Sequence, residues 1–198
     1  MIYLFLYFLM WLPLHLVLRP RIIGNKANLD CKGGVIFIAN HVALMDPIML
    51  IISSHRILHF MAKKELFSSW YGKLFFKLSF VFPVSRQTAD LKSIKQAIKL
   101  LHDGKVFGIF PEGKRSITGE LDELEGGTAF IALKSDAPVI PIYIDPESYK
   151  KMRLTLVVGE KIYADDIKGH YSRREKMEVM TRRMTNELEK LKYRLKKA

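Results

Sequence analysis

The chain lacks the features that build several common classes of protein. Its 198 residues include a single cysteine, Cys31, so no internal disulfide can form, which fits a reducing compartment. No cluster of cysteine, histidine and carboxylate residues has metal-ligand spacing, and no glycine-rich nucleotide loop is present. Internal repeats and Gly/Ser linkers are also missing. We therefore expect one domain without a bound metal or cofactor.

Negative charge is scarce relative to positive charge. Lysine and arginine together number 32 against 20 aspartates and glutamates, a formal net charge of +12 at pH 7. Such a surplus implies anionic partners such as phospholipid headgroups, coenzyme A, an acidic carrier protein or nucleic acid. The basic residues are dispersed, however, and neither a helix-turn-helix nor a base-stacking motif is evident. Nucleic acid is therefore not the expected partner.

Charge is absent from the N-terminal stretch between Ile2 and Leu18, which is followed by Arg19 and Arg21. A signal peptide would carry positive charge before its apolar run and small residues at a cleavage site, and neither is found. The stretch is short for a bilayer span and contains Pro13. We predict that residues 1–20 form a membrane-associated helix embedded in one leaflet. A short single span and a helix packed in the core are the alternatives.

Hydrophobic patterns predict alternating strands and helices. Short apolar runs predict strands at residues 35–39, 81–84, 106–109, 138–142 and 154–158. Helical periodicity marks residues 47–58, 66–78, 91–101 and the stretch from 173 onward. We expect an α/β fold over residues 21–198, with a mixed, largely parallel sheet flanked by helices and a C-terminal amphipathic helix. The aromatic face of residues 66–78 suits either the core or a membrane interface.

The most informative motif is the pair His41 and Asp46, which follows the first of these runs. Residues five apart on a regular helix lie about 140° apart, so the two side chains meet only across a turn. Pro47 favours such a turn, because proline disfavours the α conformation for the residue before it and suits the start of a helix. Asp46 is then expected to be the N-cap of a helix over residues 47–58 and to orient the imidazole of His41. His41 is therefore a candidate general base.

Two further motifs place arginines directly after apolar runs. The segment Pro-Glu-Gly-Lys-Arg ends at Arg115 and follows residues 106–109, whereas Arg86 follows residues 81–84. In an open α/β sheet, ligands collect at the carboxyl ends of the parallel strands. If these runs are neighbouring parallel strands, His41, Arg86 and Arg115 lie at one rim.

Taken in order, these motifs resemble the blocks of the glycerolipid acyltransferases, in particular the 1-acylglycerol-3-phosphate (lysophosphatidic acid) acyltransferases. Asn40, His41 and Asp46 are similar to the catalytic Asn-His-x4-Asp of that family. Residues 84–86 are similar to its second block, residues 110–116 to its Phe-Pro-Glu-Gly-Thr-Arg-Ser block, and residues 139–142 to its fourth. Four blocks in the same order are far more specific than any one of them.

The resemblance implies an acyltransferase domain over residues 21–198. Its reaction would move a fatty acyl group from a thioester to the sn-2 hydroxyl of lysophosphatidic acid, giving phosphatidic acid. It assigns catalysis to His41 as the general base with Asp46 in support, and substrate binding to Asn40, Arg86, Glu112, Gly113 and Arg115. The two arginines would grip the acceptor's phosphate, since a guanidinium binds two oxygens at once. Glu112 would orient an arginine or bind the glycerol part.

The same resemblance names the partners. The co-substrate would be acyl-CoA or acyl-acyl carrier protein, with no bound cofactor, and the protein would lie at the cytoplasmic face of a membrane, on its phospholipid surface. Two residues depart from the family pattern. Lys114 stands where the family usually has threonine, and Glu125 stands where the family commonly has lysine. Glycerol-3-phosphate or another lysolipid is the alternative acceptor. A non-catalytic basic protein that binds anionic membranes is the alternative from another class, but it leaves the spacing of His41 and Asp46 unexplained.

Overall fold

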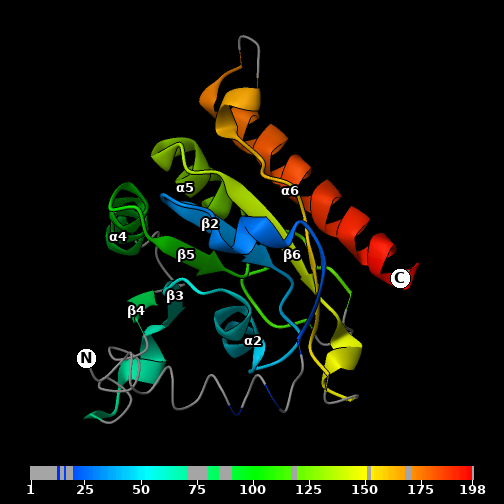
Figure 1. Ribbon diagram of the computed structural model, residues 1–198. Coiled ribbons are helices and arrows are strands. Elements are labelled where there is room, and N and C mark those ends of the chain that lie inside the picture. The colour runs from blue at the N-terminus through cyan, green and yellow to red at the C-terminus, as the bar shows by residue number, and fades with distance from the viewer. Residues whose placement is uncertain are drawn as a thin grey trace.

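The computed structural model describes residues 13, 16, 20–70, 80–84, 91–116, 120–150, 153–167 and 171–197. In this part of the chain, seven strands form one sheet in the order β1-β7-β6-β2-β5-β3-β4 (Figure 1). The strands are β1 (Arg21–Gly24), β2 (Val35–Ala39), β3 (Leu58–Lys63), β4 (Val81–Val84), β5 (Val106–Ile109), β6 (Val139–Ile144) and β7 (Thr155–Val158). The five apolar runs predicted as strands supply β2, β4, β5, β6 and β7.

The sheet is mixed and largely parallel, as the sequence predicts. From β6 through β2, β5 and β3 to β4, every neighbouring pair is parallel. β7 runs antiparallel to β6, and β1 runs parallel to β7. In the parallel block Ile38 pairs with Ile109, and Ala39 pairs with Ile142. Strands β2, β5 and β6 therefore end at nearly the same level and share one carboxyl rim.

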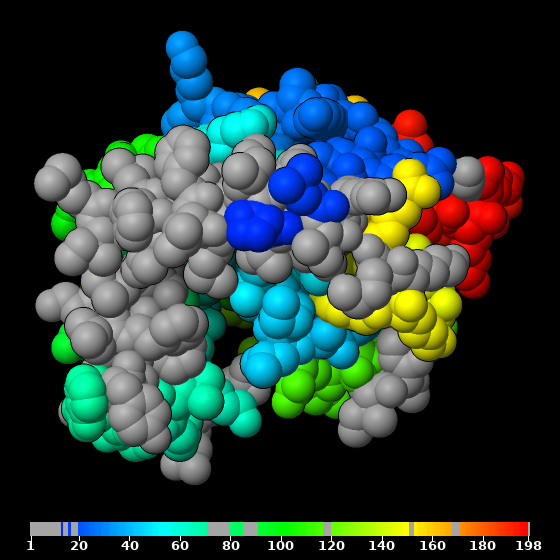
Figure 2. All heavy atoms as spheres, turned by 60° about the horizontal axis from the view of Figure 1, so that its bottom comes forward, coloured from blue at the N-terminus to red at the C-terminus, as the bar shows by residue number. Residues whose placement is uncertain are grey.

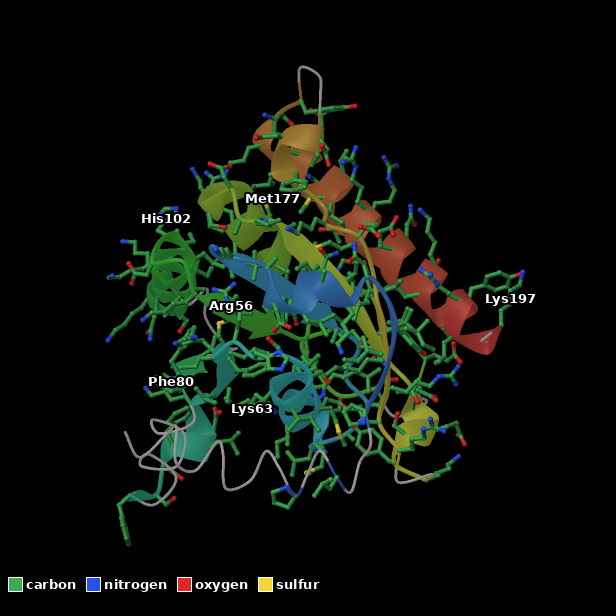
Figure 3. All side chains as sticks on the ribbon, in the orientation of Figure 1. Arg56, Lys63, Phe80, His102, Met177 and Lys197 are labelled. Atoms are coloured by element: carbon green, nitrogen blue, oxygen red, sulfur yellow. The ribbon has the colours of Figure 1, made fainter. Side chains whose placement is uncertain are left out.

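Helices cover both faces of the sheet. One face carries α4 (Leu91–His102), α5 (Gly126–Ser135) and α6 (Arg173–Lys196), whereas α2 (Asp46–Ser53) covers the other (Figure 1). In Figure 3, Met177 lies where α5 meets α6. The side chains of β2 alternate between the two cores, because successive residues of a strand point to opposite faces. Both cores therefore depend on the same central strand.

The helix α6 forms where its sequence predicts. Ser172 and Glu175 form a capping box at its start, which satisfies two backbone N–H groups at the helix end. Its buried side chains recur every three or four residues, at Met180, Met184, Leu188 and Leu191. These side chains close the core against α5, β6 and β7.

A glycine directly after α4 ends this helix. Gly104 has a φ of +73°, and its N–H bonds to the carbonyl of Leu101 while the N–H of Lys105 bonds to the carbonyl of Leu100. This is the Schellman arrangement, in which a glycine takes the left-handed conformation just after the helix. The chain then enters β5 directly.

The helix after Asp46 is shorter than predicted. It ends at Ser53, and Leu58 begins β3 instead of ending the helix. Two side chains hold the chain in its new direction, because Ser54 donates to the carbonyl of Leu29 and Arg56 donates to the carbonyls of Cys31, Gly33 and Gly104. These partners are distant in sequence, so the apolar pattern alone could not reveal the break.

Four 3-10 turns complete the described elements: η1 (Lys26–Asp30), η2 (Lys64–Phe67), η3 (Pro146–Ser148) and η4 (Ala164–Asp166). The segment predicted at residues 1–20 lies outside the described residues, apart from three of them. The helix predicted at 66–78 lies largely outside them too, and its first residues belong to η2. Among the described residues, no helix combines the length and the apolar character that crossing a membrane requires.

The buried imidazole of His59 in β3 should make the stability of the fold depend on pH. Burial lowers the pKa of His59 below its ordinary 6.5, and the hydrogen bond to the carbonyl of Val106 offsets this only in part. As the pH falls through 6.5, the unfolded chain therefore binds more protons than the folded protein. The free energy of unfolding should decrease on acidification, by at most about 1.4 kcal/mol per pH unit from this group.

Urea denaturation of His59→Leu at several pH values between about 5 and about 7 checks this, because the substitution should flatten the slope. His102→Leu, at an exposed position of α4, is the matched control and should keep the parental slope. An unaltered slope in His59→Leu would contradict the prediction.

Candidate active site

His41 and Asp46 meet across a turn, as the sequence predicts. Nδ1 of His41 lies 2.7 Å from Oδ2 of Asp46, and the same oxygen accepts the backbone N–H groups of Val42 at 2.7 Å and Ala43 at 2.8 Å. Asp46 is fully buried. Asp46 was predicted to be the N-cap of this helix, but it is the first residue of α2, and the N-cap is Met45. The difference has a simple cause: the carboxylate faces back to the turn instead of forward to the helix.

The imidazole of His41 is held between this carboxylate and an aromatic ring. Its ring stacks on Phe110 with the centroids 4.2 Å apart and the planes 20° apart. Phe110 in turn stacks on Phe60, whose ring packs directly over Gly108. A Cβ at Gly108 would lie 2.3 Å from the ring of Phe60, so only glycine fits there. With Nδ1 facing Asp46, Nε2 is the ring nitrogen left to act as a base.

Glu112 fixes the backbone of His41 from the neighbouring strand end. Its Oε1 accepts the N–H of His41 at 3.0 Å, and its Oε2 accepts the N–H of Asp122 at 3.2 Å. Burial raises the pKa of Glu112 above its ordinary value, although these hydrogen bonds act in the opposite direction. The carboxylate was expected to contact an arginine or the glycerol part of an acceptor. The structure instead engages both oxygens with backbone groups.

Asn40 is a second buried anchor. Its Oδ1 accepts the N–H of Ile144 at 2.7 Å, and its Nδ2 donates to the carbonyl of Ile144 at 3.0 Å. The side chain is only 2% exposed. The amide thus joins the end of β2 to the end of β6, behind the rim where a substrate contact was expected.

Gly113 and the two departures from the family lie together. Gly113 has a φ of +68°, and a Cβ there would lie 2.1 Å from a carboxylate oxygen of Glu125. The positive φ favours glycine at this position, and the carboxylate of Glu125 packs against it. Lys114 lies 3.5 Å from the carboxylate of Asp122, an exposed ion pair of small energetic value. The extra charge of Lys114 thus has a partner on the same loop.

Of the two predicted arginines, the structure places one at the rim. Arg115 is exposed and precedes Ser116, whose N–H donates to the carbonyl of His41 at 2.7 Å. Arg86 lies outside the described residues. The strand before it, β4, is the edge strand and lies three positions from β2, on the order of 14 Å away at the usual strand spacing. The assumption of neighbouring strands fails here because β3 lies between β5 and β4.

One contact to the pair comes from a residue without any sequence motif. The hydroxyl of Tyr149, in the connection between β6 and β7, donates to Oδ1 of Asp46. Nothing in the surrounding polar stretch distinguishes this tyrosine. Figure 2 shows the surface hollowed between the cyan segment that contains α2 and the teal segment that contains η2.

Comparison with known proteins identifies the family. The model of the Acyltransferase family matches residues 21–145. A 1-acyl-sn-glycerol-3-phosphate acyltransferase of Bacillus subtilis (strain 168) is 36% identical over 179 residues, which cover 86% of this chain and 87% of that protein. A protein of the same name from Borreliella burgdorferi is 30% identical, over 61% of this chain and 49% of its own length.

The fold is shared with a solved structure, that of the 1-acyl-sn-glycerophosphate (LPA) acyltransferase PlsC from Thermotoga maritima. The similarity has a TM-score of 0.67 at 22% sequence identity and covers 96% of this chain and 87% of that one. The matched residues contain the His41–Asp46 turn, the anchors Asn40 and Glu112, and the strands that position them. By sequence, fold and the extent of these matches, the chain belongs to the acyltransferase family.

Proposed function

We propose that this protein transfers a fatty acyl group from a thioester to the sn-2 hydroxyl of 1-acyl-sn-glycerol-3-phosphate, giving phosphatidic acid. The observation that carries the proposal is the contact of 2.7 Å between His41 and Asp46 at the carboxyl rim of an acyltransferase domain. The names of the curated relatives support the choice of acceptor. A non-catalytic membrane-binding protein would have no use for an imidazole fixed by a buried carboxylate.

His41 acts as the general base in this proposal. Asp46 accepts Nδ1–H, so Nε2 carries the lone pair and removes the proton from the acceptor hydroxyl as its oxygen attacks the thioester carbonyl. The new C–O bond forms and the C–S bond then breaks, and the thiolate leaves with the proton that His41 returns. Asp46 stabilises the imidazolium between these two transfers. The products are an ester and a free thiol.

Arg115 holds the acceptor's phosphate. It is exposed at the rim, and the hydrogen bond from Ser116 to His41 fixes its backbone beside the base. A guanidinium offers two parallel donors to phosphate oxygens. Arg86 shares this role in the proposal, and the donor is acyl-CoA or an acyl-acyl carrier protein, both of which suit a chain with a net charge of +12.

The protein works at the cytoplasmic face of a phospholipid membrane in this proposal. Exposed apolar side chains follow two of the parallel strands: Leu44, in the turn after β2, is 75% exposed, and Trp70, after β3 and η2, is 77% exposed. Lys63 and Lys64 lie between them in sequence and are exposed as well. Apolar side chains beside cations are typical of surfaces that rest on anionic lipid.

Replacing His41 with alanine should abolish transfer without unfolding the protein. Loss of the base should lower kcat/KM by a factor on the order of a hundred to ten thousand. The measurement is acyl transfer to 1-acyl-sn-glycerol-3-phosphate, with circular dichroism to check the fold. His55→Ala is the matched control, since His55 also faces a carboxylate, that of Asp30 at 2.9 Å, but on the surface. Near-normal turnover by His41→Ala would remove His41 from the mechanism.

Replacing Arg115 with alanine should weaken binding of the phosphorylated acceptor. Loss of a charge-assisted hydrogen bond should raise KM for the acceptor by about tenfold to a hundredfold and change KM for the thioester little. Initial rates over a grid of both substrates separate the two constants. Arg174→Ala removes an exposed arginine from α6 and should behave as the parent. An Arg115→Ala enzyme with unchanged kinetics would contradict this assignment.

Replacing Leu44 and Trp70 together with serine should reduce membrane binding. Each apolar side chain withdrawn from water contributes about 1.5 kcal/mol or more, so the lipid concentration for half-maximal binding should rise by at least about tenfold. Flotation with vesicles that contain anionic phospholipid, at several salt concentrations, measures this. Tyr193→Ser, at an exposed aromatic position on α6, is the control. Equal flotation of both variants would exclude the surface around Leu44 and Trp70 from lipid contact.

A matrix of donors and acceptors decides the remaining alternatives. Purified protein is incubated with acyl-CoA or acyl-acyl carrier protein, and with lysophosphatidic acid, glycerol-3-phosphate or other lysolipids, and products are identified by mass spectrometry. Phosphatidic acid as the main product supports the proposal. Vesicle binding without transfer to any acceptor would favour the non-catalytic alternative.

A further inference from the structure

The connection between β6 and β7 is built rigidly where it passes the catalytic pair. Its start is fixed because Asn40 bonds both backbone groups of Ile144. The side chain of Asp145 accepts the N–H of Glu147 at 3.0 Å and caps η3. Buried Ser148 then accepts the N–H of Thr155 at 2.9 Å, which closes the connection against β7. Tyr149 follows directly and therefore has a defined position.

Tyr149 completes the hydrogen bonding of the catalytic carboxylate. Its ring packs against the core between the sheet and α2, and its hydroxyl donates to Oδ1 of Asp46. Oδ2 is the oxygen that faces His41 and the turn. Burial first, and then the hydrogen bond to Asp46, raise the pKa of Tyr149 well above its ordinary value. The phenol therefore stays protonated and acts toward the carboxylate only as a donor.

We propose that Tyr149 is a positioning residue of the acyl transfer. Its hydroxyl locks the Asp46 carboxylate so that Oδ2 stays directed at Nδ1 of His41. The same hydrogen bond limits how strongly Oδ2 holds the imidazole proton. The inference rests on the proposed function in that His41 is taken as the base. Tyr149 lies beyond residues 21–145, which the family model matches, so that match gives it no role.

The direction of the expected pH effect follows from the charge on the carboxylate. A phenol that donates to Oδ1 draws negative charge away from Oδ2. Without it, Oδ2 holds the imidazolium more tightly, and the neutral base forms only at higher pH. Among the described residues, the titratable groups in contact with the carboxylate are His41 and Tyr149, and Glu112 faces the backbone of His41 from the connection after β5. Glu112 is unaltered by a change at Tyr149, so the shift reports on the phenol.

The test is Tyr149→Phe, which removes only the hydroxyl. We expect kcat/KM to fall by about tenfold, which corresponds to the usual energetic contribution of a hydrogen bond to a charged group. The loss should be in kcat, with little change in the KM for either substrate. The acid limb of the pH profile should move to higher pH. Tyr143→Phe removes a phenol that is also buried on β6 but lies in the core under α6, and should leave the profile unaltered.

A double-mutant cycle separates positioning from packing. If Tyr149 acts through the carboxylate, Tyr149→Phe should change the residual rate of Asp46→Asn by less than about twofold. An unaltered pH profile in Tyr149→Phe, or an equal loss in the Asp46→Asn background, would overturn the proposal.

A readout without turnover separates this proposal from the proposed function. In protein labelled with ¹⁵N-histidine, the ring resonances of His41 should titrate at higher pH in Tyr149→Phe. Fluorotyrosine at position 149, whose phenol is a stronger donor, should move that titration to lower pH, and it keeps the test open if the phenylalanine variant does not fold. Failure of acyl transfer with every acceptor would refute the proposed function alone. Unmoved resonances in these variants would refute the role of Tyr149 alone.

Discussion

The burial of one carboxylate governs the arrangement of the whole site. A charge withdrawn from water is tolerated only where hydrogen bonds replace its hydration, and Asp46 gathers donors from the His41 ring, the backbone of its own turn and the phenol of Tyr149. These donors come from segments about a hundred residues apart. The turn after β2 and the connection after β6 must therefore both be in place before the imidazole has a fixed orientation.

The mixed topology of the sheet makes that meeting possible. A parallel connection after β6 would have to cross the sheet and return through a helix, which carries the chain away from the rim. Because β7 runs antiparallel to β6, a short connection stays at the rim instead. Asn40 fixes the start of this connection by hydrogen bonding to both backbone groups of Ile144. From the side of β5, Glu112 fixes the backbone of His41 by accepting its N–H. Asn40 and Glu112 thus form a frame around His41.

The sequence predicts those parts of the structure that local pattern determines. The central strands are uninterrupted apolar runs, and α6 has both a capping box and a clear period, so their positions agree with expectation. β3 escapes prediction because its apolar residues continue the pattern of α2, and the break depends on contacts of Ser54 and Arg56 with distant backbone. Motif spacing also cannot show that Asn40 and Glu112 are buried, and no local pattern predicts the contact of Tyr149.

The pairing of β1 with β7 has a consequence for the order of folding. Arg21 pairs with Thr155, so roughly 130 residues of chain separate the two partners. During synthesis β1 leaves the ribosome early, yet its backbone groups have no strand to bind until β7 emerges. The central parallel strands have shorter separations and can assemble first. Closure of the edge between β1 and β7 is therefore expected to follow assembly of the central strands, because it closes the longest chain loop between paired strands of the sheet.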